Sequence, residues 1–198
     1  MPSHLSSELR AFASGWLPGA PACVLDVGCG DGESTRWLAA AGYEAFGIDP
    51  AAPAKPGFDR VRIQDFDASE PFDAALAIRC LHHVGGLGAA VDSLAVALRP
   101  RARLVIFEYA IEAVDERALR WSAERGLATP VNLGVAEDVT PLADVREALG
   151  RRFRLLASEP APYLAREARR PELEASEREA IDAGRLAAAG ARLAYELL

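Results

Sequence analysis

The sequence is short of cysteine, histidine and positive charge, and each shortage argues against a class of function. Its 198 residues include three cysteines, three histidines and 22 basic side chains against 29 acidic ones, which leaves a net charge of −7. Cys23, Cys29 and Cys80 form no Cys-x-x-Cys pair, and no histidine stands at zinc-finger spacing, so we expect no metal site. Because a chain this acidic repels a phosphate backbone, nucleic acid is not the expected partner.

Long apolar runs are also missing. No stretch approaches the roughly 18 residues that a membrane span requires. The opening segment MPSHLSSELRAFASGW lacks the basic region and apolar core of a signal peptide. Cysteines without partners are typical of small buried residues in a reducing compartment. These absences favour a cytoplasmic protein without a membrane partner, and the length suits one domain with its own core.

Apolar strands alternate with amphipathic helices from residue 22 to residue 125. Strands are expected at 22–27, 44–48, 60–63, 72–78 and 102–109, and helices at 4–17, 33–41, 87–98 and 114–125. This alternation predicts a parallel α/β sheet wound on both faces. The pattern then loosens into a loop at 130–139, a helix at 142–149, a strand at 153–157, a charged helix at 171–183 and an apolar stretch at 186–197.

The segment V24-L25-D26-V27-G28-C29-G30-D31-G32-E33 places three glycines in five positions behind a buried strand. In an open α/β sheet, ligands bind outside the carboxyl ends of the strands, and glycine lets a ligand lie against the main chain. A dinucleotide fingerprint has its third glycine where Glu33 stands, and a carboxylate there is a poor neighbour for a pyrophosphate. Asp49 ends the second strand, where an acid accepts hydrogen bonds from ribose hydroxyls in NAD proteins and others alike.

Five segments in register resemble the class I S-adenosylmethionine-dependent methyltransferases. They are DVGCGDG (26–32), GIDP (47–50), FDAALAIRCLHHV (72–84), LRPRARLVIFEY (98–109) and the N-terminal helix, which matches the usual lid. The stretch 179–195 resembles the end of small bacterial methyltransferases of the type 11 group, in which a helix leads into an antiparallel last strand. The resemblance implies a single domain over 1–198, with a lid helix in 1–20 and a variable acceptor side and C-terminal sheet edge in 126–198. The implied fold is a Rossmann-like, doubly wound sheet of seven strands in the order 3-2-1-4-5-7-6.

The resemblance also implies S-adenosylmethionine as the cofactor and residues that hold its methionine part. Gly28, Cys29 and Gly30 would contact it through their backbone. Asp26 would orient the glycine loop and, through water, the methionine amine. Arg79, just past the fourth strand, would reach the methionine end.

The remaining implied contacts concern the adenosine part. Asp49 would hold the ribose, with Pro50 beside the adenine. Asp65 would accept a hydrogen bond from the adenine amino group, and Phe66 would pack on the ring.

Methyl transfer from a sulfonium is mainly a task of alignment and exclusion of water, although an acceptor that loses a proton also needs a base. His83 and Glu108 are our candidates, because His83 follows the fourth strand and Glu108 lies at the end of the fifth, both at the expected ligand edge. A packing role is the competing interpretation of the His82-His83 pair. Methyltransferases of nucleobase amines carry Asn/Asp-Pro-Pro-aromatic where this chain has Arg-Cys-Leu-His (79–82), so a small-molecule acceptor is favoured.

Two other functions share the same features. A regulatory protein that binds S-adenosylmethionine without transferring the methyl group would keep the glycine loop and Asp49. An NAD-dependent oxidoreductase would also keep them, although Glu33 and the lack of a Tyr-x-x-x-Lys pair count against it. The sequence does not indicate an oligomeric state.

Overall fold

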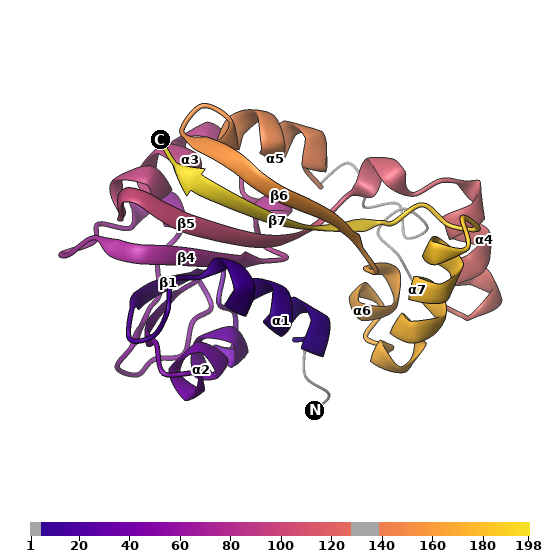
Figure 1. The fold of residues 1–198 in the computed structure, drawn as a ribbon, viewed down its shortest axis with the longest axis horizontal. Coiled ribbons are helices and arrows are strands. Elements are labelled where there is room, and N and C mark those ends of the chain that lie inside the picture. The colour runs from indigo at the N-terminus through magenta and orange to yellow at the C-terminus, as the bar shows by residue number, and fades with distance from the viewer. Residues whose placement is uncertain (1–4, 128–138) are drawn as a thin grey trace.

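The computed structural model describes residues 5–127 and 139–198, and its strands form one sheet (Figure 1). The strands are β1 (Cys23–Val27), β2 (Glu44–Ile48), β3 (Phe58–Asp59), β4 (Phe72–Ile78), β5 (Leu98–Tyr109), β6 (Phe153–Ala161) and β7 (Gly190–Leu197). Their order is β3-β2-β1-β4-β5-β7-β6. The first five are parallel, and β7 runs antiparallel between β5 and β6. The predicted seven-stranded Rossmann-like fold and its strand order are confirmed.

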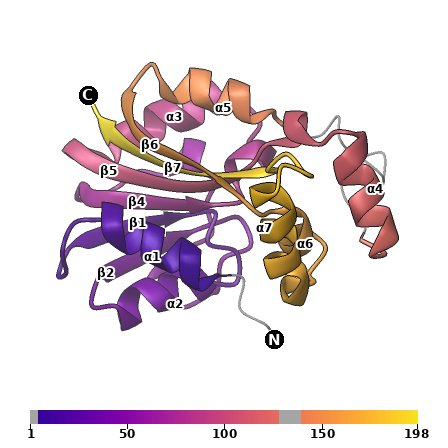
Figure 2. The same cartoon turned by 45° about the vertical axis from the view of Figure 1, so that its right-hand side comes forward.

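Helices cover both faces of the sheet (Figures 1 and 2). They are α1 (Ser7–Trp16), α2 (Glu33–Ala40), α3 (Leu87–Val96), α4 (Glu116–Glu124), α5 (Leu142–Leu149), α6 (Leu164–Glu167) and α7 (Glu174–Asp182). One face packs against α1 and α2, and the opposite face packs against α3 and α5. Within the described ranges, no helix combines the length and apolar composition needed to cross a membrane.

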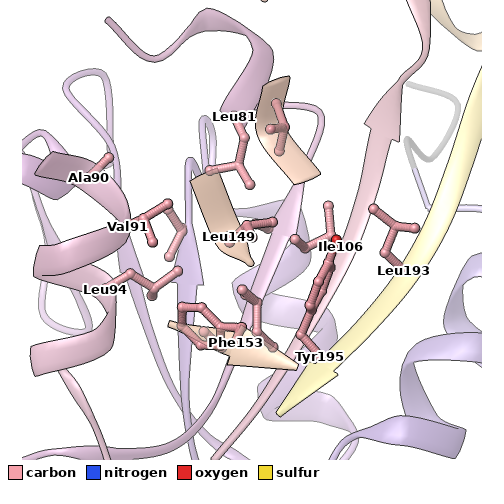
Figure 3. Packing of buried hydrophobic residues seen from close by; sticks show 14 of the residues in the cluster. Leu81, Ala90, Val91, Leu94, Ile106, Leu149, Phe153, Leu193 and Tyr195 are labelled. Carbon is pink, nitrogen blue, oxygen red and sulfur yellow. The ribbon is translucent and has the colours of Figure 1, made fainter. Parts of the chain in front are cut away.

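Successive side chains of a strand point to opposite faces of the sheet, and helices cover both faces, so the central strands β1, β4 and β5 are largely buried. Leu104 and Ile106 of β5 face α3 and α5, whereas Val105 between them faces α1 and α2. Figure 3 shows the first of these cores, where Ile106 lies among side chains of α3, α5 and β7. The continuous apolar runs of the sequence therefore became central strands, as predicted.

A third cluster of buried side chains lies at the carboxyl end of β5. Phe107 and Tyr109 pack there with Trp121 of α4 and with Tyr163, which precedes α6. The short helix α6 had no prediction, and β6 is longer than its predicted range of 153–157. The loop predicted at 130–139 lies outside the described residues except for Val139.

The third strand was predicted at 60–63, and this placement is wrong. The strand is Phe58–Asp59, which pairs with Gly47 and Ile48 at the end of β2. Ile63 instead begins a 3₁₀ turn that ends at Asp65 and is buried against the core. The apolar side chain of Ile63 indicated a buried residue. A strand of two residues, however, is too short to show the alternation of apolar and polar residues by which a strand is recognised in a sequence.

Candidate active site at the carboxyl ends of the strands

The glycine loop connects β1 to α2 by a backbone path that other residues cannot follow. Gly28 has a φ of 69° and donates its N–H to the carbonyl of Ile48 at 2.8 Å. A Cβ on Gly28 would lie 2.3 Å from the Cβ of Cys80, so the loop passes directly against the segment after β4. Gly32, with a φ of 84°, forms the N-cap of α2. These positive φ angles bring bare backbone to the edge of the sheet.

Asp26 is a carboxylate buried beneath this loop. Its side chain is 1% exposed, and its Oδ2 accepts hydrogen bonds from the hydroxyls of Ser34 and Thr35, both at 2.6 Å. Its Oδ1 is buried and has no hydrogen-bond partner among the described residues. Burial raises the pKa of Asp26 to about 6, against the hydrogen bonds that lower it. Its Oδ1 thus keeps the capacity to accept a further hydrogen bond.

Two adjoining cavities open beside the loop. The first, which we call the Asp49 cavity, has a volume of about 310 Å³. It is lined by Val27, Gly28, Ile48, Asp49, Pro50, Val61, Arg62, Ile63, Gln64, Arg79, Cys80, His83, Val84 and Gly85. The second, the Glu33 cavity, has a volume of about 250 Å³. It is lined by Leu5, Gly28, Cys29, Gly30, Asp31, Glu33, Ser34, Ile78 and Arg79. Because Gly28 and Arg79 line both, an elongated ligand can extend from one cavity into the other.

Asp49 follows β2 at the wall of its cavity. Its Oδ1 accepts the backbone N–H of Ala51 at 2.7 Å, which fixes the carboxylate. Its second oxygen has no hydrogen bond within 5–127 and 139–198. Pro50 is exposed beside it and lines the same cavity. Both residues therefore lie together in the wall of one cavity, next to the end of β2.

Asp65 and Phe66 lie outside the cavity that they were expected to line. The Asp65 carboxylate pairs with Arg62 at 2.6 Å, and Phe66 stacks on Phe46 with ring centroids 6.2 Å apart. Ile63 and Gln64 line the cavity instead. In a 3₁₀ turn each residue rotates the side-chain direction by about a third of a circle, so only part of the turn faces the ligand. Sequence reasoning missed Gln64, although the motif lay one residue away.

Arg79 directly follows β4 and forms the shared wall of the two cavities. Its φ of 54° is unusual for a residue other than glycine. Its Nη2 donates to Glu167 of α6 at 2.8 Å, and its guanidinium lies 5.5 Å from the centroid of the Tyr163 ring. The sequence indicated Arg79 as a site residue but contained no signal for Glu167, because the two are 88 positions apart.

Glu108 is fully buried at the end of β5 and does not line either cavity. Its Oε2 accepts the backbone N–H of Leu81 at 2.8 Å, and its Oε1 accepts that of Tyr109 at 2.9 Å. The same Oε1 contacts Nδ1 of His82, which is 3% exposed. Both oxygens thus have partners inside the protein. The structure does not support the expectation that Glu108 acts as a base.

His83 lies in the Asp49 cavity, unlike its neighbour His82. The two rings are 4.0 Å apart between centroids, so the buried His82 supports the ring of His83. Burial, followed by the nearby His82, lowers the pKa of His83. The imidazole is therefore neutral near pH 7 and can accept a proton. Among the described residues, no group of three or more His, Cys, Asp or Glu side chains is arranged to hold a metal ion.

A bare glycine loop, a buried acid beneath it and an acid after β2 define a nucleoside-binding α/β domain. Residues 2–133 match the family model described as a methyltransferase domain, and the chain belongs to that family. It is 30% identical over 119 residues to a ubiquinone biosynthesis O-methyltransferase of Bradyrhizobium diazoefficiens. That match covers 50% of this chain and 47% of the relative, so the chain spans about half the length of that curated protein.

Solved structures show the same fold over nearly the whole chain. An S-adenosylmethionine-dependent methyltransferase from Mesorhizobium loti matches with a TM-score of 0.63 and 19% identity, covering 96% of this chain and 98% of that one. The N-methyltransferase NodS from Bradyrhizobium japonicum, in complex with S-adenosyl-L-homocysteine, matches with a TM-score of 0.57 and 17% identity, covering 96% and 82%. At these identities the likeness concerns the fold. Together with the family match, it confirms the predicted resemblance to class I methyltransferases.

Proposed function

We propose that this protein transfers the methyl group of S-adenosylmethionine to a small-molecule acceptor and releases S-adenosylhomocysteine. The observation that carries the proposal is a pair of adjoining cavities that share Gly28 of the glycine loop and Arg79, with Asp49 in the wall of one of them. When bound, the cofactor supplies an activated methyl group, so the protein needs mainly to align the acceptor and exclude water.

The residues present fit the methionine part of this cofactor. Bare backbone at Gly28, Cys29 and Gly30 lines the Glu33 cavity, where a Cβ on Gly28 would collide with Cys80. The free Oδ1 of Asp26 would accept a hydrogen bond from the methionine amine, directly or through water. Arg79 would pair with the methionine carboxylate, because it is the cation on the shared wall of the cavities.

The Asp49 cavity suits the adenosine part. The second oxygen of Asp49 would accept hydrogen bonds from ribose hydroxyls, and Pro50 would lie against the adenine. We assign the adenine edge to Gln64 in place of Asp65, because Gln64 lines the cavity and its side chain is held by a hydrogen bond to the carbonyl of Gly85.

His83 is the base in this proposal. It lines the Asp49 cavity as a neutral imidazole and would take a proton from an acceptor hydroxyl or amine. Glu108 acts indirectly: it holds His82 and the backbone of Leu81, and so fixes the segment that carries His83. A hydroxyl acceptor is the first to test, since a relative is named as an O-methyltransferase of ubiquinone biosynthesis. The three free cysteines are compatible with a cytoplasmic location.

Ligand-dependent thermal stabilisation is the first test. We expect S-adenosylmethionine and S-adenosylhomocysteine to raise the melting temperature and NADH to leave it unchanged. Glu33 supports this expectation, because it stands in the first turn of α2, where a dinucleotide would place its pyrophosphate. Stabilisation by NADH alone would show that the cofactor is assigned incorrectly.

A panel of hydroxyl, amine and activated-carbon acceptors then tests transfer itself. Formation of S-adenosylhomocysteine above background with one acceptor supports the enzyme. Tight cofactor binding with no turnover across the panel would instead support a protein that binds S-adenosylmethionine for regulation.

A further inference from the structure

Glu177 is a third buried carboxylate, besides Asp26 and Glu108. It belongs to α7 and is 1% exposed. Its Oε1 accepts the backbone N–H groups of Tyr163 and Leu164 at 2.8 and 3.0 Å, and its Oε2 accepts that of Ala165 at 2.9 Å. One side chain thus satisfies three successive donors at the start of α6.

Helix α6 depends on this contact from outside. It has four residues, from Leu164 to Glu167, and its N-cap residue Tyr163 provides no side-chain capping hydrogen bond. A helix this short is not stable by itself, so tertiary contacts must hold it. Besides the hydrogen bonds to Glu177, these tertiary contacts include the packing of Tyr163 and Leu164 in the buried cluster at the end of β5.

The two ends of α6 both contact Arg79. Tyr163, at the first end, presents its ring to the guanidinium at 5.5 Å, and Glu167, at the last, pairs with Nη2 at 2.8 Å. The Nε of Arg79 is buried without a partner among the described residues, so the guanidinium keeps a donor for a further acceptor. The Arg79 side chain is long and flexible, so these two contacts fix the position of its guanidinium group. The backbone of Arg79 is strained as well, with a positive φ.

We propose that Glu177 is a positioning residue for the cofactor: by capping α6 it holds Tyr163 and Glu167, which aim Arg79 at the carboxylate of the methionine part. This inference rests on the proposed function, since it takes S-adenosylmethionine as the ligand. Glu177 lies outside the five matching motifs, and the inference gives it a role in the binding of the cofactor.

The test compares two ligands that differ only in that carboxylate. S-Adenosylhomocysteine has it, and decarboxylated S-adenosylhomocysteine keeps the adenosine and the amine but lacks it. Dissociation constants are measured by calorimetry for the wild type, Glu177→Gln, Arg79→Met and the double variant. We expect Glu177→Gln to weaken S-adenosylhomocysteine roughly tenfold, as for a lost hydrogen bond to a charged group, and to leave the decarboxylated ligand within about twofold.

The double variant shows whether the two residues act together. If Glu177 acts through Arg79, adding Glu177→Gln to Arg79→Met produces no further loss. Glu167→Gln provides a second variant that removes the Arg79 partner without touching the cap, and we expect it to reproduce the selective loss. It keeps the inference testable even if Glu177→Gln does not fold.

Glu196→Gln is the matched control, because Glu196 is a buried carboxylate paired with Arg103 of β5 and Arg154 of β6. We expect it to leave the ratio of the two dissociation constants unchanged. Equal weakening of both ligands by Glu177→Gln and Glu167→Gln, or no weakening of S-adenosylhomocysteine, would overturn the positioning role. Failure of the wild type to bind S-adenosylhomocysteine would instead refute the proposed function.

Discussion

The imidazole of His82 lies against the fully buried carboxylate of Glu108, and this contact ties the segment after β4 to the end of β5. These two strands are neighbours in the sheet, so the contact joins the turn that carries His83 to the end of the strand that carries Tyr109. The charge of the buried Glu108 carboxylate is compensated by the donors around it, so separating the carboxylate from these donors should destabilise the fold.

Glu108→Ala is therefore expected to destabilise the protein by about 3 kcal/mol. It would leave His82 and the N–H groups of Leu81 and Tyr109 without their acceptor. Urea unfolding measures the change. The control is Glu159→Ala, which removes an exposed partner of Arg192 and should cost less than about 1 kcal/mol. Equal effects from the two variants would contradict the anchoring role.

His83→Asn is expected to lower kcat by about 10²- to 10⁴-fold because it removes a base. Since His83 also lines the Asp49 cavity, the loss in kcat should exceed any change in cofactor affinity. In the wild type, kcat/KM should rise with pH as His83 loses its proton. Because burial and the nearby His82 lower the pKa of His83 from its usual 6.5, the midpoint of this rise should lie below pH 6.5. The measurement is a pH–rate profile with the first active acceptor, and a profile that His83→Asn leaves unaltered would exclude His83 as the base.

Asp26→Asn should have opposite effects on stability and on binding. In the folded protein the pKa of Asp26 is about 6, above the usual 3.8, so folding favours the protonated acid. The protein therefore loses stability as the pH rises from about 4 through 6, because the buried group becomes ionised. A neutral Asn should raise the melting temperature of the ligand-free protein at pH 7.

The same substitution should weaken S-adenosylhomocysteine at least roughly tenfold, because the charge facing the methionine amine is lost. Wild-type binding should likewise weaken as pH falls below about 6. Thermal scans with and without ligand from pH 5 to pH 8 test both effects. Asp73→Asn is the control, for which we expect the opposite change in stability. The hydrogen bond from the Cys23 N–H and the pairing with Arg99 lower the pKa of Asp73, so removing this carboxylate should lower the melting temperature.

Gln64→Ala and Asp65→Ala separate the two assignments of the adenine contact. Gln64→Ala should weaken S-adenosylhomocysteine by about 1 kcal/mol, whereas Asp65→Ala should leave it nearly unchanged, because only Gln64 lines the cavity. Asp49→Ala, which removes the ribose acceptor, should cost about 1–3 kcal/mol and serves as the positive control. The reverse order for Gln64 and Asp65 would restore the sequence-based assignment.

Several elements of the site were predictable because their signals are local. Gly28 and Asp49 each follow an apolar strand, and parallel strands bring their carboxyl ends to one edge. The resemblance to class I methyltransferases also predicted the order of the strands, and the stretch 179–195 predicted the antiparallel β7.

The sequence by itself thus determined the sheet, the glycine loop and the acid after β2, since each depends on residues close together in the chain. Only the tertiary structure decided which way side chains turn and which distant residues meet. The phase of a 3₁₀ turn brought Gln64 to the cavity in place of Asp65. Packing turned Glu108 inward, and α6 brought Glu167 to Arg79 across 88 positions. Such contacts form when the whole sheet assembles, so no local pattern can record them.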